Sequence, residues 1–181
     1  HGRPLARALS LAPDAVAVAT PASTHAAVAL QLADSGYAGP LFVEKPLALS
    51  EEDADVFSSW PHAVTAVGCN WRFHPIVVKC LAGWRDAGGS PFSRAVAWVH
   101  CDMRTWPGRG YADSLLECGS HEIDLLRYAT GCDLRVSYAE RQGPGWVIML
   151  VGDGCEAHVS IDGASPVFSR GLRLLTRDGF C

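Results

Sequence analysis

The chain has 181 residues, of which 49% are hydrophobic and 19% are charged, so it is long enough for one sizeable domain or two small ones. Its formal net charge is −4 and it contains no basic block, so we do not expect nucleic acid or an anionic membrane as a partner. No apolar run approaches the length that crosses a bilayer.

Seven cysteines are spaced widely and irregularly, without a C-x-x-C pair. This spacing argues against both a disulfide framework and a zinc site, so we expect no metal. The pattern is typical of buried or free thiols in a reducing compartment, and we therefore expect a cytoplasmic protein.

The first elements read as a strand followed by a helix. The run "PDAVAVATP" (residues 13–21) is continuously apolar, which is typical of a strand buried on both faces of a parallel sheet. The next run, "STHAAVALQLADSG" (residues 23–36), predicts a helix that Ser23 caps and Gly36 ends. We expect the apolar side of this helix to comprise Ala27, Leu30 and Leu32.

The same strand-and-helix unit then repeats. "PLFVEKP" (residues 40–46) predicts a second strand, which completes a βαβ unit with a right-handed crossover. Ser50 with Asp53 forms a capping box at the start of a second helix, and "HAVTAVG" (residues 62–68) predicts a third parallel strand. The alternation over residues 14–68 predicts an α/β fold, specifically a partial Rossmann-like, doubly wound parallel sheet.

The pattern changes after Arg72. Helices are predicted over residues 74–89 and 113–131, with a long strand at residues 92–103 between them, and several strand-like runs follow. In "CEAHVSID" (residues 155–162) apolar and polar residues alternate strictly, which is typical of an antiparallel sheet with one open face. We therefore predict two domains, a Rossmann-like part at 1–73 and an α+β domain with a mainly antiparallel open sheet at 74–181.

The first candidate site lies where strands of the parallel sheet end. Ligands of such sheets bind beyond the carboxyl ends of the strands, where Thr20-Pro21 and Glu44-Lys45-Pro46 are placed. Pro46 biases Lys45 toward an extended backbone, so the lysine is held at the rim, where its ammonium could polarise an oxygen. On residue chemistry alone, the alternative that Glu44 and Lys45 merely solvate the strand end is favoured.

The second candidate site is a polar stripe on the helix at 113–131. Glu117, His121 and Asp124 are spaced i, i+4, i+7 and share one face, whereas most of the remaining circumference is apolar. The stripe suits a cleft wall, with His121 transferring a proton and Glu117 orienting it or accepting from a substrate hydroxyl. The alternatives are an amphipathic helix that faces water and a metal site, but "HEIDL" departs from H-E-x-x-H at Leu125.

Two further residues are weaker candidates. His25 lies in the first turn of its helix, where it could approach a bound anion or nucleotide or simply be a surface histidine. Arg72, in "NWRFHP", follows the third strand and could reach the same rim, or could pair with a carboxylate for structural reasons.

Four stretches together carry a resemblance: "AVAVATPASTH", "VEKP", "GCNWRFHP" and "LLECGSHEIDLLRYATG". In this order and at these separations they resemble the glucose–fructose oxidoreductase, inositol dehydrogenase and MocA-like (Gfo/Idh/MocA) family. The resemblance covers roughly residues 14–131. It implies an NAD(P)-dependent oxidoreductase that acts on a sugar, cyclitol or related polyol, and we expect a homo-oligomer formed through the open sheet.

The resemblance also implies roles for individual residues. Lys45 would lie beside the nicotinamide and the reacting oxygen, and His121 would exchange the proton of the same substrate hydroxyl. The carboxylate Glu117 would assist His121, although the family often has Asp at this position, which leaves the role of Glu117 open. Thr20, Pro21, His25 and Glu44 would contribute to the cofactor-side wall, and Arg72 and Asp124 to the substrate side.

The chain departs from the family because it lacks the glycine-rich turn G-x-G-x-x-G that receives the pyrophosphate. We therefore expect the first mononucleotide-binding half to be absent, and the chain to be truncated at its N-terminus and also at its C-terminus. An incomplete parallel sheet would expose an edge and an apolar face, and the chain by itself would bind NAD(P) weakly or not at all.

Two other functions stay open at this point. One is a non-catalytic sugar-binding or assembly module that has lost dinucleotide binding, which the missing glycine turn favours. The other is a metal hydrolase built on Glu117, His121 and Asp124, which a chelator would inactivate.

Overall fold

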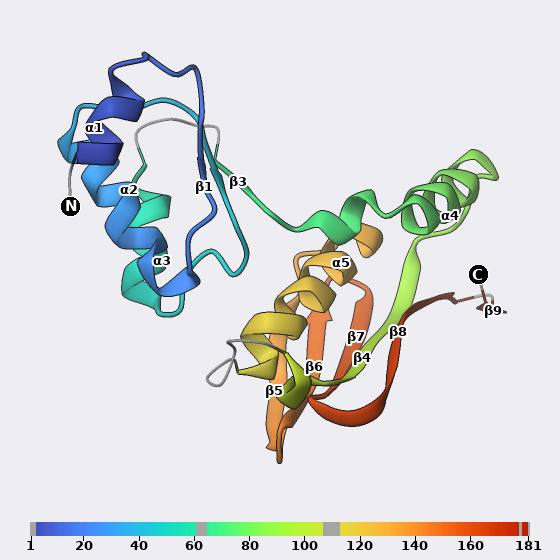
Figure 1. Ribbon diagram of the computed structural model, residues 1–181. Helices are drawn as coiled ribbons and strands as arrows, with labels where there is room; N and C mark the ends of the chain where they lie inside the picture. Colours follow the sequence, from blue (N-terminus) through green and yellow to red (C-terminus); the bar gives the residue numbers. More distant parts are fainter. Residues whose placement is uncertain (1–2, 61–64, 107–112, 178, 181) are drawn as a thin grey trace. The chain divides into compact units, whose positions relative to one another are not determined.

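The computed structural model describes residues 3–60, 65–106, 113–177 and 179–180 (Figure 1). The chain divides into two compact units, residues 1–68 and residues 69–181. The first holds a three-stranded parallel sheet and the second a six-stranded, mainly antiparallel sheet, which confirms the expected fold class.

The unit at 1–68 alternates helices and short strands. In chain order its elements are α1 (Arg3–Leu9), β1 (Val16–Val18), the 3₁₀ turn η1 (Ala22–Thr24), α2 (His25–Asp34), β2 (Leu41–Val43), α3 (Glu51–Ser58) and β3 (Thr65–Val67). The strand order is β1-β2-β3 and both pairings are parallel, as predicted. The predicted third strand begins at residue 62, and its residues 62–64 lie outside the described part.

The core of this unit lies on one face of the sheet. Alternate strand residues are packed with α2 and α3 in a cluster comprising Val18, Ala26, Ala29, Leu32, Leu41, Val43, Phe57 and Trp60. The intervening residues Ala17, Phe42 and Ala66, which pair with each other across the sheet, are exposed. Burial on both faces is therefore the wrong interpretation of these apolar runs, whereas an exposed apolar face, with Phe42 40% exposed, was expected.

The start of α2 differs from the prediction. Ser23 lies inside η1 and does not cap the helix, whose N-cap is Thr24 without a side-chain hydrogen bond. Because α2 begins at His25, its buried row runs through Ala26, Ala29 and Leu32, and Ala27 and Leu30 point to solvent. Gly36 follows the helix at φ 80°, a conformation that glycine adopts without strain, and the predicted end is confirmed.

The start of α3 matches the prediction. The Ser50 side chain accepts a hydrogen bond from the Asp53 amide at 3.2 Å, which satisfies one of the unpaired donors at the helix N-terminus.

The unit at 69–181 packs helices against one face of its sheet (Figure 1). It begins with the 3₁₀ turn η2 (Asn70–Phe73), α4 (Pro75–Asp86), β4 (Phe92–Asp102) and η3 (Met103–Thr105). It continues with η4 (Leu115–Gly119), α5 (Ser120–Thr130), β5 (Arg135–Gln142), β6 (Gly145–Gly152), β7 (Cys155–Asp162), β8 (Ala164–Thr176) and β9 (Gly179–Phe180). The strand order is β5-β6-β7-β4-β8-β9, and among the described strands of this sheet only β7 and β4 pair in parallel.

The predicted alternation in β7 is confirmed. Cys155, Ala157, Val159 and Ile161 belong to a core cluster with β4, β6 and α5 residues, and the intervening polar residues face the other way. The hairpin before β7 has Gly154 at φ 77°, as expected for its tight turn.

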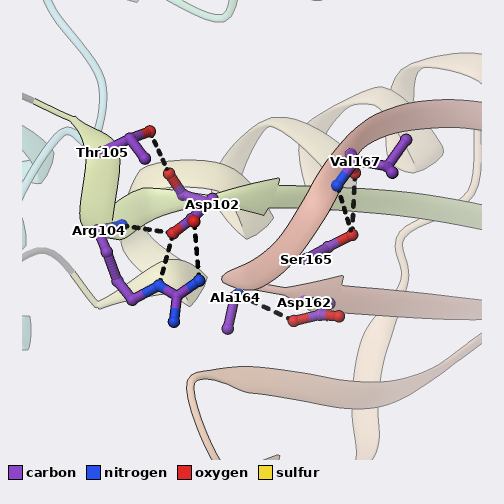
Figure 2. A network of polar contacts seen from close by, with 7 residues as sticks. All are labelled: Asp102, Arg104, Thr105, Asp162, Ala164, Ser165 and Val167. Carbon is purple, nitrogen blue, oxygen red and sulfur yellow. Dashed lines mark hydrogen bonds and ion pairs between the residues drawn. The ribbon is translucent and has the colours of Figure 1, made fainter.

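Polar contacts fix the point where β4 ends beside the β7–β8 connection (Figure 2). The Asp102 carboxylate accepts from Arg104 Nε and Nη2 at 2.7 and 2.8 Å, which lowers the pKa of Asp102. Asp162 Oδ1 accepts from the Ala164 amide at 2.9 Å, so both turns are closed by side-chain carboxylates.

The helix predicted at 113–131 begins differently from the expectation. Residues 115–119 form one π-helical turn, and regular α-helix starts at Ser120. A Cβ atom on Gly119 would lie 2.6 Å from Ile161 Cδ1, so the glycine permits this turn to pack closely on β7. Gly131 ends the helix at φ 69°, as predicted.

Candidate functional site

The two predicted groups of site residues lie in different units, and each is described within its own. In the unit at 1–68, backbone hydrogen bonds join the carboxyl end of each strand to that of its neighbour. The Glu44 amide donates to the Val18 carbonyl at 2.9 Å, and the Gly68 amide donates to the Val43 carbonyl at 2.8 Å. Thr20 and Glu44-Lys45 therefore both lie just beyond this edge of the parallel sheet, as predicted.

Glu44 and Lys45 are half-buried at this edge. The Glu44 carboxylate folds back on the backbone, since its Oε2 accepts from the Lys45 amide at 3.2 Å. A Cβ atom on Gly68 would lie 3.0 Å from the same oxygen, so the glycine at the end of β3 makes room for the carboxylate. Pro46, which is buried, follows Lys45 through a cis peptide bond.

His25 is not a surface residue, because it is 0% exposed. Its Nε2 lies 2.8 Å from the Thr20 carbonyl, and its Nδ1 lies 3.1 Å from the Pro46 carbonyl. The interpretation of His25 as a surface histidine is therefore wrong, whereas its contribution to a nucleotide site stays a prediction. The signal in the sequence was ambiguous, because carbonyls that lie against His25 belong to Pro46 and Leu47, which are 21 and 22 residues away.

In the unit at 69–181, His121 lies one residue after the junction between η4 and α5. It is 8% exposed, whereas Glu117, on the π turn, is half-buried. The helix is π-helical at Glu117 and regular α-helix from Ser120, so the spacing of Glu117 and His121 departs from that of a regular α-helix, and their shared face stays a prediction.

Asp124 and Arg72, which were both predicted to bind substrate, form an ion pair with each other. Arg72 Nε donates to Asp124 Oδ2 at 2.7 Å, and its Nη2 contacts Oδ1. The Arg72 guanidinium also lies over the Tyr128 ring at 5.3 Å. The hydrogen bond from Arg72 to Asp124 is the main cause that raises the pKa of Arg72. This arrangement is the structural pairing that was weighed as an alternative to substrate binding.

Sequence reasoning missed a second pair on the same helix. Glu122 is 2% exposed, and its Oε1 accepts from Arg170 Nε of β8 at 2.5 Å. Arg170 in turn lies 4.0 Å from the centre of the Trp71 ring. Glu122, Leu126 and Ala129 are spaced i, i+4, i+7 and are all buried, so the spacing did signal that Glu122 faces inward.

Thiols near His121 are held in the protonated form. Cys118, one turn before His121, lies 3.9 Å from Cys101, and burial raises the pKa of the Cys118 thiol to about 12. None of the six cysteines in the described ranges is joined in a disulfide. In the same ranges no three His, Cys, Asp or Glu side chains are grouped as a metal would require, and Asp124 is engaged by Arg72.

No helix in the described residues has the length and apolar character needed to span a membrane.

Comparison with known proteins gives matches for most of the chain. Residues 5–58 match the model of an oxidoreductase family with an NAD-binding Rossmann fold. The chain is 30% identical over 131 residues to scyllo-inositol 2-dehydrogenase (NAD(+)) of Bacillus subtilis (strain 168), an alignment that covers 67% of this chain and 36% of that protein.

Solved structures match over a larger part of the chain. A UDP-N-acetylglucosamine 3-dehydrogenase from Acidithiobacillus ferrooxidans superposes with a TM-score of 0.74 at 25% identity, over 94% of this chain and 57% of that one. An inositol dehydrogenase homologue from Azotobacter vinelandii, solved with NADH and myo-inositol, has a TM-score of 0.73 at 18% identity, over 91% and 48% of the two chains, and shows the shared fold. The chain thus spans between about a third and three fifths of the length of these relatives.

Proposed function

We propose that this chain, a relative of the Gfo/Idh/MocA oxidoreductases, carries charge-stabilising and proton-transfer residues of an NAD(P)-dependent oxidoreductase that acts on a sugar, cyclitol or related polyol. The observation that carries the proposal is the similarity to an inositol dehydrogenase over 67% of the chain. The placement of Lys45 beyond the carboxyl end of β2, where ligands of parallel sheets bind, supports it.

The residues at the carboxyl edge of the parallel sheet fit the nicotinamide side of a dinucleotide better than its pyrophosphate. Exposed Thr20 and Pro21 and half-buried Glu44 would form the wall on the nicotinamide side. The sequence holds no G-x-G-x-x-G turn for the pyrophosphate. NAD is the cofactor that the family model supports, and NADP is kept as the second possibility.

The chain's own residues would manage the charge and the proton of the reacting alcohol. When bound, the nicotinamide supplies the ring that exchanges hydride with the substrate carbon. The Lys45 ammonium would stabilise the substrate oxygen as it gains negative charge, and His121 would take up the hydroxyl proton. Glu117 would orient His121 or accept from a substrate hydroxyl. Because His121 is almost fully buried, water competes little for this proton.

Lys79 provides a matched control for a test of these roles. The chain has two lysines, and Lys79 is exposed on α4. We would follow the absorbance of reduced nicotinamide with a panel of polyols for the wild type, Lys45→Ala, His121→Ala and Lys79→Ala. Loss of either residue should lower kcat/KM by about 100-fold or more, and Lys79→Ala should leave it unchanged. Equal rates in all four proteins would remove the catalytic assignment.

The alternative is a non-catalytic sugar-binding or assembly module. Calorimetry on the same four proteins distinguishes it from the enzyme by measuring the binding of polyol and of nucleotide. Binding of a polyol without binding of NADH or NADPH would favour the module over the enzyme. Micromolar affinity for either nucleotide would exclude a chain that has lost dinucleotide binding.

We also propose that the chain forms a homo-oligomer through the open face of its six-stranded sheet. Ile148 and Leu150 of β6 belong to the core, so Met149 and Val151 between them lie on the opposite face, where they are 39% and 44% exposed. Tyr138 of β5 pairs with Met149 and is 51% exposed. An apolar strip of this kind is typical of a protein interface.

A further inference from the structure

One buried histidine takes no part in the proposed chemistry. His25 is fully buried at the first residue of α2, and both nitrogens of its ring face backbone carbonyl oxygens. Nε2 lies 2.8 Å from the Thr20 carbonyl, and Nδ1 lies 3.1 Å from the Pro46 carbonyl and 3.3 Å from the Leu47 carbonyl. A carbonyl oxygen only accepts hydrogen bonds, and a neutral imidazole carries one N–H, so the tautomer decides which of these carbonyls the ring donates to.

These carbonyls come from two separate segments of the chain. Thr20 follows β1, and Pro46 and Leu47 follow Lys45 beyond β2. The backbone ladder between the two strands ends at the Glu44 amide, which donates to Val18. Pro46 has no N–H, so beyond this point its backbone can be tied only through its carbonyl. The His25 ring is the group that lies within hydrogen-bond distance of that carbonyl.

We propose that His25 is a positioning residue for Lys45: in the tautomer with the proton on Nδ1, the ring donates to the Pro46 carbonyl and holds the segment after Lys45, so that the ammonium extends from a fixed backbone. The catalytic consequence rests on the role proposed above for Lys45. The positioning itself concerns two backbone segments of one unit and is measurable without turnover.

Two conservative substitutions distinguish the contact made at Nδ1 from the contact made at Nε2. The amide nitrogen of Asn lies as many bonds from Cα as Nδ1 of histidine, so His25→Asn keeps a donor for the Pro46 carbonyl. The amide of Gln reaches one atom further, so His25→Gln keeps a donor for the Thr20 carbonyl and loses the one for Pro46. Both variants remain polar at a buried site with carbonyl partners, so the comparison between them is matched.

The readout is the rate at which the Lys45 amine is reductively methylated, measured by mass spectrometry relative to exposed Lys79 in the same molecule. A residue on a loosened segment reacts faster, so His25→Gln should raise the Lys45 to Lys79 ratio several-fold, and His25→Asn should keep the wild-type ratio. Amide exchange in β2 serves as the control that the sheet remains folded.

Three results would overturn the proposal: the same ratio in wild type and both variants, an equal rise in both variants, or a larger rise in His25→Asn. Because labelling does not require cofactor or substrate, its outcome is independent of the oxidoreductase assignment. A selective rise in His25→Gln in a protein that oxidises no polyol would keep the positioning role and remove the function.

Discussion

The two units hold their charged side chains by different means. On α5, Glu122 and Asp124 are each engaged by an arginine, from β8 and from η2. At the end of β2, the Glu44 carboxylate accepts from a backbone amide, and the segment that carries Lys45 is tied through backbone carbonyls to His25. In the first arrangement, ion pairs neutralise the carboxylates and join α5 to β8 and η2. In the second, the backbone to which Lys45 is attached determines where its charge lies.

This difference predicts that stability and activity respond to different substitutions. Removing one partner of a buried ion pair leaves the other charge buried and uncompensated, which is costly. Removing a half-buried lysine from the rim of a sheet exposes little and costs little stability, although the chemistry proposed for it would be lost.

The largest effect is expected at Arg170. Its replacement by Met keeps much of the volume but leaves the Glu122 carboxylate, 2% exposed, without the guanidinium, so Arg170→Met should lower the free energy of unfolding by about 3–5 kcal/mol. Urea unfolding measures this loss. Adding Glu122→Gln should recover part of it, because an amide is cheaper to bury than a carboxylate.

A surface pair gives the matched control for Arg170. Arg94 and Glu156 lie 3.9 Å apart with side chains 72% and 68% exposed. Arg94→Met should change the unfolding free energy by less than about 0.5 kcal/mol. If both Arg→Met variants lowered the free energy of unfolding equally, the buried pair would not stabilise the packing of β8 against α5.

A smaller effect is expected at Arg72, whose side chain is 40% exposed. If the pair with Asp124 is structural, Arg72→Gln and Asp124→Asn should each lower the unfolding free energy by about 1 kcal/mol, discounted for exposure to solvent, and leave KM unchanged. If these residues bind substrate as the family resemblance implies, KM should rise with little change in stability. Urea unfolding and steady-state kinetics on both variants decide between the two roles.

Local signals in the sequence were sufficient for most of the fold. The Ser50 cap, the glycine after α2 and the alternation in β7 each depend on neighbours within a few residues, and all three are confirmed. The placement of Lys45 at the end of a parallel strand followed from the same local reasoning. Its proposed chemistry depends on the family resemblance and stays a prediction.

Three of the differences between prediction and structure have a common physical cause, because each involves a contact distant in sequence. His25 is buried by carbonyls about 21 residues away, and Glu122 is paired across 48 residues. The π turn before α5 accommodates the contact of Gly119 with Ile161 on another strand. Helical periodicity indicated that Glu122 faces inward, but no pattern within the helix identifies Arg170 as its partner.

The smallest predicted effect concerns two serines at the helix starts of the unit at 1–68. Ser50 Oγ accepts from the Asp53 amide, so Ser50→Ala should destabilise α3 by about 1 kcal/mol, seen as faster amide exchange in its first turn. Ser23 is exposed inside η1 and does not cap α2, so Ser23→Ala should change stability by less than about 0.5 kcal/mol. An equal loss in both variants would mean that Ser23 caps α2 in solution, and that α2 starts earlier than His25. In that case the His25 ring would leave the position from which it is proposed to donate to the Pro46 carbonyl.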